Sequence, residues 1–186
     1  MIRVSYMGIP FSNSEEAAER FAERMGWGPV ELIPEVTSQG VVDSLTAGES
    51  DYGAVAFGNI TAGPVRETEL ALAGRTDIET VAEITLPIHH CVFVRRGDAE
   101  VRALASHVQA LMQTRANLRR LYPDAEWIET EDTAYAAELL AGGRLPEGTA
   151  VICRRNAGEH HGLELIHENI EDRSDNITAF ILIRRV

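Results

Sequence analysis

Residues 52–63 read YGAVAFGNITAG, a run of small and apolar residues that passes without a break into glycine and polar side chains. The apolar part, residues 52–57, predicts a buried strand, and Gly58 and Gly63 bound a polar loop. Outward from this strand, the chain alternates between short apolar runs and segments with helical spacing. This alternation predicts an α/β fold with largely parallel sheets.

Helices are expected where apolar residues recur every three or four positions. The first begins at Ser14, which we expect to act as its N-cap, and ends at Gly26. Further helices are expected at 41–47, 65–73, 107–121, 133–140 and 154–161. Strands are expected near 4–7 and at 30–36, 52–57, 78–95 (one long strand or two), 101–105, 126–129, 150–153, 163–166 and 177–185.

The length of 186 residues suits one compact domain or two small lobes that share a core. The chain contains no sequence repeat and no obvious linker, so two lobes would be joined by strands. We expect lobe 1 over about 1–80 plus 168–186 and lobe 2 over about 81–167, within a single domain of 1–186. The ligand site is then expected in a cleft between the lobes.

The formal net charge of −12 argues against nucleic acid or an anionic membrane surface as a partner. All 17 basic residues are arginine, because the chain contains no lysine. This composition excludes enzymes that depend on a Schiff-base lysine or on a P-loop lysine.

No apolar run approaches the roughly 20 residues that a membrane-spanning helix needs, and the N-terminus lacks the apolar stretch of a signal peptide. We therefore expect a cytoplasmic protein with Cys91 and Cys153 as buried thiols. The adjacent pairs His89-His90 and His160-His161 lack the spacing of metal ligands, since neighbours in a strand point to opposite faces. Structural roles are favoured for both pairs, and no metal site is expected.

Uncharged polar residues gather in a few loops of the predicted fold. Because helix starts and strand ends attract carboxylates in α/β proteins, these loops are candidate ligand sites. The simpler interpretation is that each residue caps a helix or satisfies a turn. The candidates are Asn59 and Thr61, Ser106, Gln109 and Gln113, Thr133, and Asn176 and Thr178.

Five segments, in order along the chain, resemble motifs of the catalytic domain of the prephenate dehydratase family. Residues 172–180, DRSDNITAF, are similar to its Asp-x-x-x-Asn-x-Thr-Arg-Phe signature, and residues 51–65 to its Ala-Asp-x-Gly-Val-Val-Pro-Ile-Glu-Asn-Ser-x-x-Gly-x-Val block. Residues 106–113, SHVQALMQ, resemble Ser-His-Pro-Gln-Ala-Leu-x-Gln. The other two are the opening segment 8–18 and TAYAA at 133–137. Together the five cover nearly the whole chain.

The resemblance implies a lyase of phenylalanine biosynthesis that converts prephenate to phenylpyruvate, with loss of carbon dioxide and the ring hydroxyl. It implies catalytic roles for Thr178, Asn59 and Gln113, with the threonine hydroxyl as donor to the leaving hydroxyl or as a proton relay. It also implies a small dicarboxylate substrate, no metal or organic cofactor, a homodimer, and two lobes similar to type-II periplasmic-binding proteins. The expected substrate-binding residues are Ser14, Ser106, Gln109, Thr133, Asn176 and Thr61.

The sequence departs from the family pattern at several positions. Ala179 replaces the arginine of the closing signature, Gly58 replaces the glutamate before Asn59, and Val108 replaces a proline. The opening motif has Phe-Ser-Asn at 11–13 where the family has Gly-Thr-Phe. Loss of an arginine that binds a substrate carboxylate would remove about 1.5–3 kcal/mol of binding. The arginines that could compensate are Arg66, Arg154 and Arg173.

Two other functions stay open. A non-aromatising prephenate decarboxylase of secondary metabolism is permitted by the changed residues Ala179, Gly58 and Asn13, whereas Thr178 favours dehydration. A non-catalytic protein that binds small carboxylates would share the two-lobed fold. The chain ends where the catalytic domain of the family ends, so we expect no phenylalanine-sensing ACT domain after it and no chorismate mutase domain before it.

Overall fold

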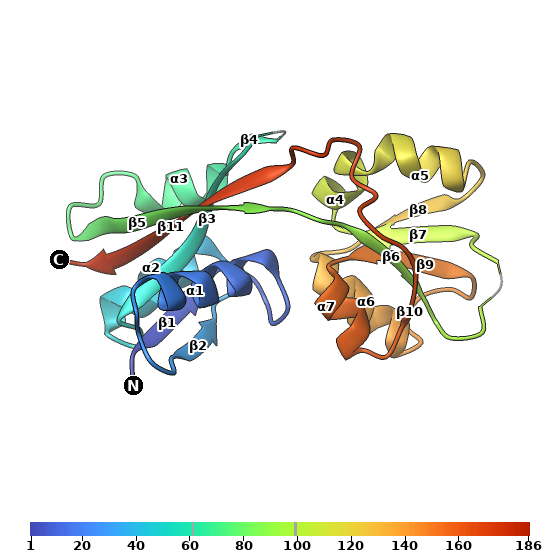
Figure 1. Ribbon diagram of the computed structural model, residues 1–186. Coiled ribbons are helices and arrows are strands. Elements are labelled where there is room, and N and C mark those ends of the chain that lie inside the picture. The colour runs from blue at the N-terminus through green and yellow to red at the C-terminus, as the bar shows by residue number, and fades with distance from the viewer. Residues whose placement is uncertain (61, 99) are drawn as a thin grey trace. The chain divides into compact units, whose positions relative to one another are not determined.

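A computed structural model describes residues 1–60, 62–98 and 100–186 (Figure 1). The chain forms two compact units, residues 1–88 together with 177–186, and residues 89–176. It passes from the first unit to the second at 88/89 and returns at 176/177. Among the described residues, no helix has both the length and the apolar character needed to cross a membrane.

The first unit contains a sheet with helices on both of its faces (Figure 1). Its helices are α1 (Asn13–Arg24), α2 (Ser38–Ala47) and α3 (Arg66–Leu72). Its strands are β1 (Arg3–Tyr6), β2 (Glu31–Pro34), β3 (Tyr52–Asn59), β4 (Gly63–Pro64), β5 (Ile78–Pro87) and β11 (Ile177–Arg185). The strand order is β2-β1-β3-β11-β5, with β4 paired to the end of β3.

Alternate residues of β11 enter two separate apolar layers of the first unit. Phe180 and Leu182 pack in one core cluster with Phe21 of α1. Ile181 and Ile183 pack in another cluster with residues of α2 and α3. Successive side chains of a strand point to opposite faces, so β11 is buried on both sides of the sheet.

The second unit is built on the strand order β10-β6-β9-β7-β8. These strands are β6 (Cys91–Val94), β7 (Ala103–Ser106), β8 (Glu126–Glu129), β9 (Thr149–Cys153) and β10 (Glu164–His167). Its helices are α4 (Val108–Gln113), α5 (Arg115–Leu121), α6 (Thr133–Ala141) and α7 (Arg155–His160). As expected, Cys91 and Cys153 are buried free thiols, and they are register partners on β6 and β9. Burial raises the pKa of both thiols.

The α/β class is confirmed, but the expectation of largely parallel sheets is wrong. In the first sheet β1 runs parallel to β2 and β3, whereas β11 runs antiparallel to β3 and β5. The second sheet is likewise parallel around β7 and antiparallel around β6. The chain leaves the first unit after β5 and returns along β11, so these adjacent strands run in opposite directions. The alternation of strands and helices in the sequence does not predict that β11 pairs with β3 and β5 in antiparallel direction.

Helix boundaries also differ from the prediction, and α2 begins at Ser38 and not at residue 41. The N-cap of α1 is Ser12, whose side chain accepts a hydrogen bond from the backbone N–H of Glu15, so Ser14 lies inside the helix. The single helix expected over 107–121 is two helices, α4 and α5, which meet at Thr114. The Thr114 hydroxyl donates to the carbonyl of Ala110, a local bond that competes with regular helix.

Candidate active site

Thr178 lies near the start of β11, opposite Asn59 at the end of β3. The Asn59 Nδ2 group donates a 2.8 Å hydrogen bond to Thr178 Oγ1, and Thr178 is only 8% exposed. Asn59 Oδ1 accepts from the backbone N–H of Ala62 at 2.9 Å, which sets the direction of the amide. A threonine hydroxyl that accepts from an amide keeps its own hydrogen for donation to another oxygen.

A β-bulge follows the pair formed by Asn59 and Thr178. Ala179 pairs with Gly58 and Phe180 with Ala56, so Phe57 is the extra residue on β3. Because side chains alternate along β11, Thr178 shares the face of Phe180, which packs against α1. Ala179 shares the opposite face, where Ile181 packs with α2 and α3. The side chain at 179 therefore leaves the sheet away from the Thr178 hydroxyl.

Gln113, at the end of α4, is held by a separate polar cluster in the second unit. Its Oε1 atom accepts a hydrogen bond from Asn176 Nδ2 at 3.0 Å, and His90 Nε2 lies 2.8 Å from the same oxygen. A carbonyl oxygen can only accept, so His90 Nε2 carries the hydrogen and the ring is the Nε2–H tautomer. The structure thus brings together two of the sequence-predicted residues, Gln113 and Asn176.

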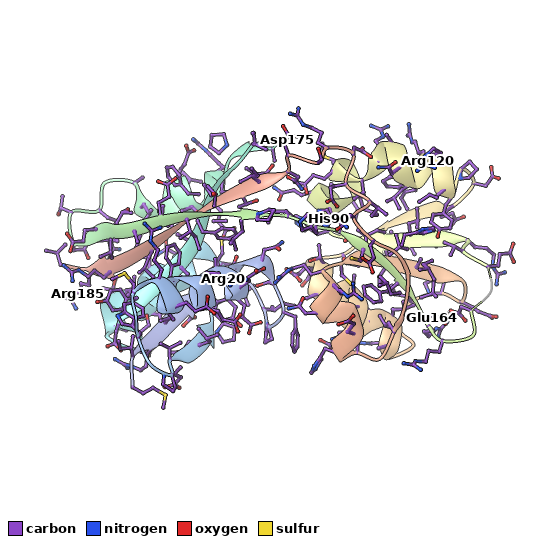
Figure 2. All side chains as sticks on the ribbon, in the orientation of Figure 1. Arg20, His90, Arg120, Glu164, Asp175 and Arg185 are labelled. Atoms are coloured by element: carbon purple, nitrogen blue, oxygen red, sulfur yellow. The ribbon has the colours of Figure 1, made fainter. Side chains whose placement is uncertain are left out.

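His90 is a buried, neutral side chain on the segment between β5 and β6 (Figure 2). It is 3% exposed, and burial lowers the pKa of its ring below the ordinary 6.5. Its backbone N–H donates to Glu171 Oε2 at 3.0 Å. The other oxygen of Glu171 lies 2.7 Å from His89 Nδ1. The neighbouring glutamate therefore holds the backbone of His90, while the ring reaches Gln113.

The segment just before Asn176 is fixed to the start of α5. The Asp172 carboxylate accepts hydrogen bonds from the backbone N–H groups of Ala116 and Asn117, both at 2.9 Å. The backbone N–H of Asp172 donates to the carbonyl of Gln113 at 2.7 Å. A carboxylate at this position satisfies free N–H groups of the first helical turn. The first acid of the closing signature thus supports the backbone of Gln113.

Ser14 and Thr133 lie in the first turns of their helices. Ser14 is buried in α1 behind its true N-cap, Ser12. Thr133 is half-buried at the start of α6, whose N-cap is Asp132. The side chain of Asp132 accepts from the backbone N–H groups of Ala134 and Tyr135. Capping of these two helices therefore falls to residues other than the predicted ligands.

The remaining candidates differ in exposure. Ser106 was expected at a helix start, but it is the last residue of β7, fully buried, and its hydroxyl donates to the carbonyl of Ile152. Gln109 is exposed on α4. Thr61 lies outside the residues that the structure describes. A ligand role for Ser106 would have to use the oxygen lone pairs of its hydroxyl, because its hydrogen is engaged.

The sequence did not predict the hydrogen bonds that His90, Glu171 and Asp172 make around Gln113. The argument that adjacent histidines point to opposite faces of a strand fails here. His89 and His90 precede β6, while His160 ends α7 and His161 follows it. The signal available was the acidic pair at 171–172, four residues before Asn176. In residues 1–60, 62–98 and 100–186, no three His, Cys, Asp or Glu side chains group closely enough to hold a metal ion.

The whole chain can be compared with proteins of known family. Residues 4–186 match the family model described as prephenate dehydratase. A prephenate dehydratase from Amycolatopsis methanolica is 34% identical over 100% of this chain and 59% of its own length. Arogenate dehydratase 5 from Arabidopsis thaliana is 32% identical over 99% of this chain and 42% of its own length. The chain thus spans about half the length of these relatives.

Solved structures agree with this relationship. The prephenate dehydratase of Arthrobacter aurescens, solved in complex with L-Phe, superposes with a TM-score of 0.88 at 26% identity. It is covered over 61% of its length by 100% of this chain. A periplasmic substrate-binding protein of an ABC transporter from Coxiella burnetii shares the fold alone, with a TM-score of 0.51 at 15% identity, over 100% of this chain and 84% of that protein.

Proposed function

Because the chain belongs to the prephenate dehydratase family, we propose that it is a lyase that converts prephenate to phenylpyruvate in aromatic amino acid biosynthesis. The hydrogen bond between Asn59 and the buried Thr178 carries the proposal. A hydroxyl held in one orientation by a neighbouring amide is suited to donate to a leaving oxygen. This is the group that a dehydration requires and that a decarboxylation alone does not.

In the proposed reaction the ring hydroxyl leaves as water and the ring carboxylate leaves as carbon dioxide. The electron pair of the broken C–C bond enters the ring, which becomes aromatic, and the C–O bond breaks with its electrons on oxygen. One proton is therefore consumed. Thr178 donates its hydrogen bond to the departing oxygen, and donation from Asn59 to Thr178 Oγ1 makes that hydroxyl a stronger donor.

Gln113 is proposed to bind a polar group of the substrate through its NH2 group. Its oxygen accepts from Asn176 and lies beside His90 Nε2, so the amide is oriented before any ligand arrives. A donor fixed in advance costs little reorganisation when charge develops on the substrate. Asn176 is accordingly proposed to orient Gln113, in addition to any contact of its own.

Arogenate is the second substrate to be tested, since several plant relatives of this chain are arogenate dehydratases. Purified protein would be incubated near neutral pH with prephenate and, separately, with arogenate, and the products separated by chromatography. Phenylpyruvate from prephenate above the spontaneous rate supports the proposal. A dihydro-hydroxyphenylpyruvate product would identify a non-aromatising decarboxylase. If both substrates stay unchanged, the alternative that fits is a non-catalytic protein that binds small carboxylates.

Removal of the Thr178 hydroxyl tests its role directly. Thr178→Ala is expected to lower kcat by about 10²- to 10³-fold, the range typical for a positioned donor. Thr178→Ser keeps the hydroxyl and is the matched control, with most of the activity retained. Circular dichroism melts check that both variants fold. Full turnover by folded Thr178→Ala would refute the role of this residue.

We further propose that the protein is a cytoplasmic homodimer, as the family resemblance implies, and that it needs no metal or cofactor. Light scattering coupled to size exclusion measures the mass in solution against the 20.4 kDa of one chain. Unchanged turnover after dialysis against a chelator would support catalysis without a metal.

A further inference from the structure

Among the residues that the structure describes, the side-chain hydrogen bonds of the Gln113 amide involve its oxygen. Its Oε1 atom has two lone pairs, and two neighbours occupy them, Asn176 Nδ2 at 3.0 Å and His90 Nε2 at 2.8 Å. Both contacts use the oxygen, so the N–H bonds of the amide point away from His90 and Asn176. Rotation of the amide by half a turn would set N–H groups against two other donors, and this orientation is disfavoured.

His90 is itself held from two directions. Its backbone N–H donates to Glu171 Oε2, and its carbonyl accepts from the backbone N–H of Ile170 at 3.0 Å. The ring is buried, so the position of Nε2 follows from a fixed backbone and a packed side chain. Among the residues that the structure describes, His90 Nδ1 is one of few buried side-chain atoms without a hydrogen-bond partner.

The lone Nδ1 atom argues against a packing role for this histidine. An apolar side chain of similar size would fill the space without burying an unpaired acceptor, which destabilises a fold. An apolar residue would not, however, donate a hydrogen bond to Gln113, as Nε2–H of His90 does. The titratable groups that face the ring, Glu171 and His89, shift its pKa in opposite directions, and burial, the largest cause, lowers that pKa.

We propose that His90 is a positioning residue that sets the orientation of the Gln113 amide, so that Gln113 presents N–H donors and not its oxygen to an anionic substrate. The inference deepens the proposed function, because it takes Gln113 as a substrate-binding residue. Without the Nε2–H donor, the Gln113 amide can rotate and present its oxygen to the substrate. That oxygen and a substrate carboxylate repel each other. Loss of this orientation should therefore weaken substrate binding and slow the chemical step.

Three variants of His90 separate donation from packing. His90→Leu fills the space without a donor and should lower kcat/KM at least tenfold without lowering the melting temperature. His90→Gln places an N–H group about as far out as Nε2 and should recover most of the activity. His90→Asn carries the same amide on a shorter side chain, at the level of Nδ1, and should not recover it. Wild-type turnover by His90→Leu, or equal activity of the Gln and Asn variants, would overturn the proposal.

A measurement on the wild-type protein does not depend on activity. The ¹⁵N shifts of the His90 ring distinguish a hydrogen on Nε2 from one on Nδ1, and the side-chain NH2 signals of Gln113 report whether the amide is fixed. We expect the Nε2–H tautomer and a single amide orientation that is lost in His90→Leu. An Nδ1–H tautomer, or an unchanged Gln113 signal in that variant, refutes the inference. Lack of turnover of prephenate and arogenate by wild type, with these signals as expected, refutes the proposed function alone.

Discussion

Thr178 and Ala179 are neighbours in sequence, yet they face opposite sides of one sheet. Thr178 lies on the face covered by α1, and Ala179 on the face covered by α2 and α3. Ala179 pairs across the strands with Gly58, the second position that departs from the family pattern. The two departures are therefore a pair, and we propose that an arginine and a glutamate at these positions interact with each other and not with substrate.

The double variant Gly58→Glu/Ala179→Arg tests this pairing. A side chain is tolerated at Gly58, because the contact that an added Cβ would make with the described residues is with the Gly63 carbonyl oxygen, at 3.9 Å. We expect a favourable coupling of about 0.2–1 kcal/mol between the two changes, measured by urea unfolding of both singles and the double. The KM of Ala179→Arg should stay within about twofold of wild type. A large fall in KM for that single variant would instead assign position 179 to substrate binding.

Two histidines with lowered pKa values make stability depend on pH. Burial lowers the pKa of His90 and of His161 below 6.5, so the unfolded chain binds protons more readily than the folded one. Their contribution is present above pH 6.5 and is lost as the pH falls through the lowered values. Urea unfolding at pH 7.5 and 5.5 should show lower stability at pH 5.5, and His90→Gln should reduce the difference. An identical pH dependence in that variant would contradict this assignment.

The carboxylates with lowered pKa values affect stability in a separate, more acidic pH range. Hydrogen bonds from arginine lower the pKa of Asp51, Asp77 and Asp175 below the ordinary 3.8. Their contribution is present above that value and is lost as the pH falls further. A comparison between pH 7.5 and 5.5 therefore reports on the histidines and not on these exposed ion pairs.

Among the elements, α4 and α5 depend on a carboxylate from a distant part of the chain. Asp172 accepts from two backbone N–H groups at the start of α5, and its own N–H donates to the carbonyl of Gln113. The closing segment therefore supports the backbone of Gln113 in the second unit, in addition to carrying Asn176 and Thr178 themselves. The acid of the family signature has a structural role that a motif comparison does not reveal.

Replacement of this carboxylate should destabilise the second unit. Asp172→Ala is expected to lower the free energy of unfolding by about 0.5–2 kcal/mol, the range for loss of a helix cap, and Asp172→Asn by less. Chemical denaturation followed by circular dichroism provides the measurement. Asp175→Ala is the matched control, because Asp175 is an exposed partner of Arg173, and its loss should change little. Equal effects of the two alanine variants would rule out the capping role.

Taken as a whole, the chain has separate apolar cores in its two units. Leu182 lies in a core of the first unit and Leu104 in the core of the second, and both are fully buried. The first unit is formed by two stretches of chain that flank residues 89–176. The entropy cost of closing so long a loop grows only with the logarithm of its length, so the first sheet can persist when the second unit opens.

Native-state hydrogen exchange should therefore report two cooperative units. Leu104→Ala is expected to cost about 2–5 kcal/mol and to reduce protection in β6, β7 and β9 more than in β3 and β11. Leu182→Ala is the matched variant and should reduce protection in β3 and β11. Equal loss of protection in both units of Leu104→Ala would show that they unfold as one.

The α/β class, the family and the polar residues worth testing could be predicted from the sequence. Apolar runs mark strands such as β3 whatever their neighbours are, and motif residues such as Asn59 and Thr178 are recognisable by order and spacing. Cap assignment was less reliable, since Ser12 and Ser14 both fit the pattern and only backbone geometry selects Ser12.

Strand direction and side-chain pairing depended on contacts between distant parts of the chain. Asn59 meets Thr178 because β11 returns beside β3 in antiparallel register, 119 residues later. His90 meets Gln113 because Glu171 and Ile170 bind its backbone, which no local pattern encodes. Local sequence determines which residues are buried or polar, whereas the partner of each polar group depends on which distant segments of the chain pack together.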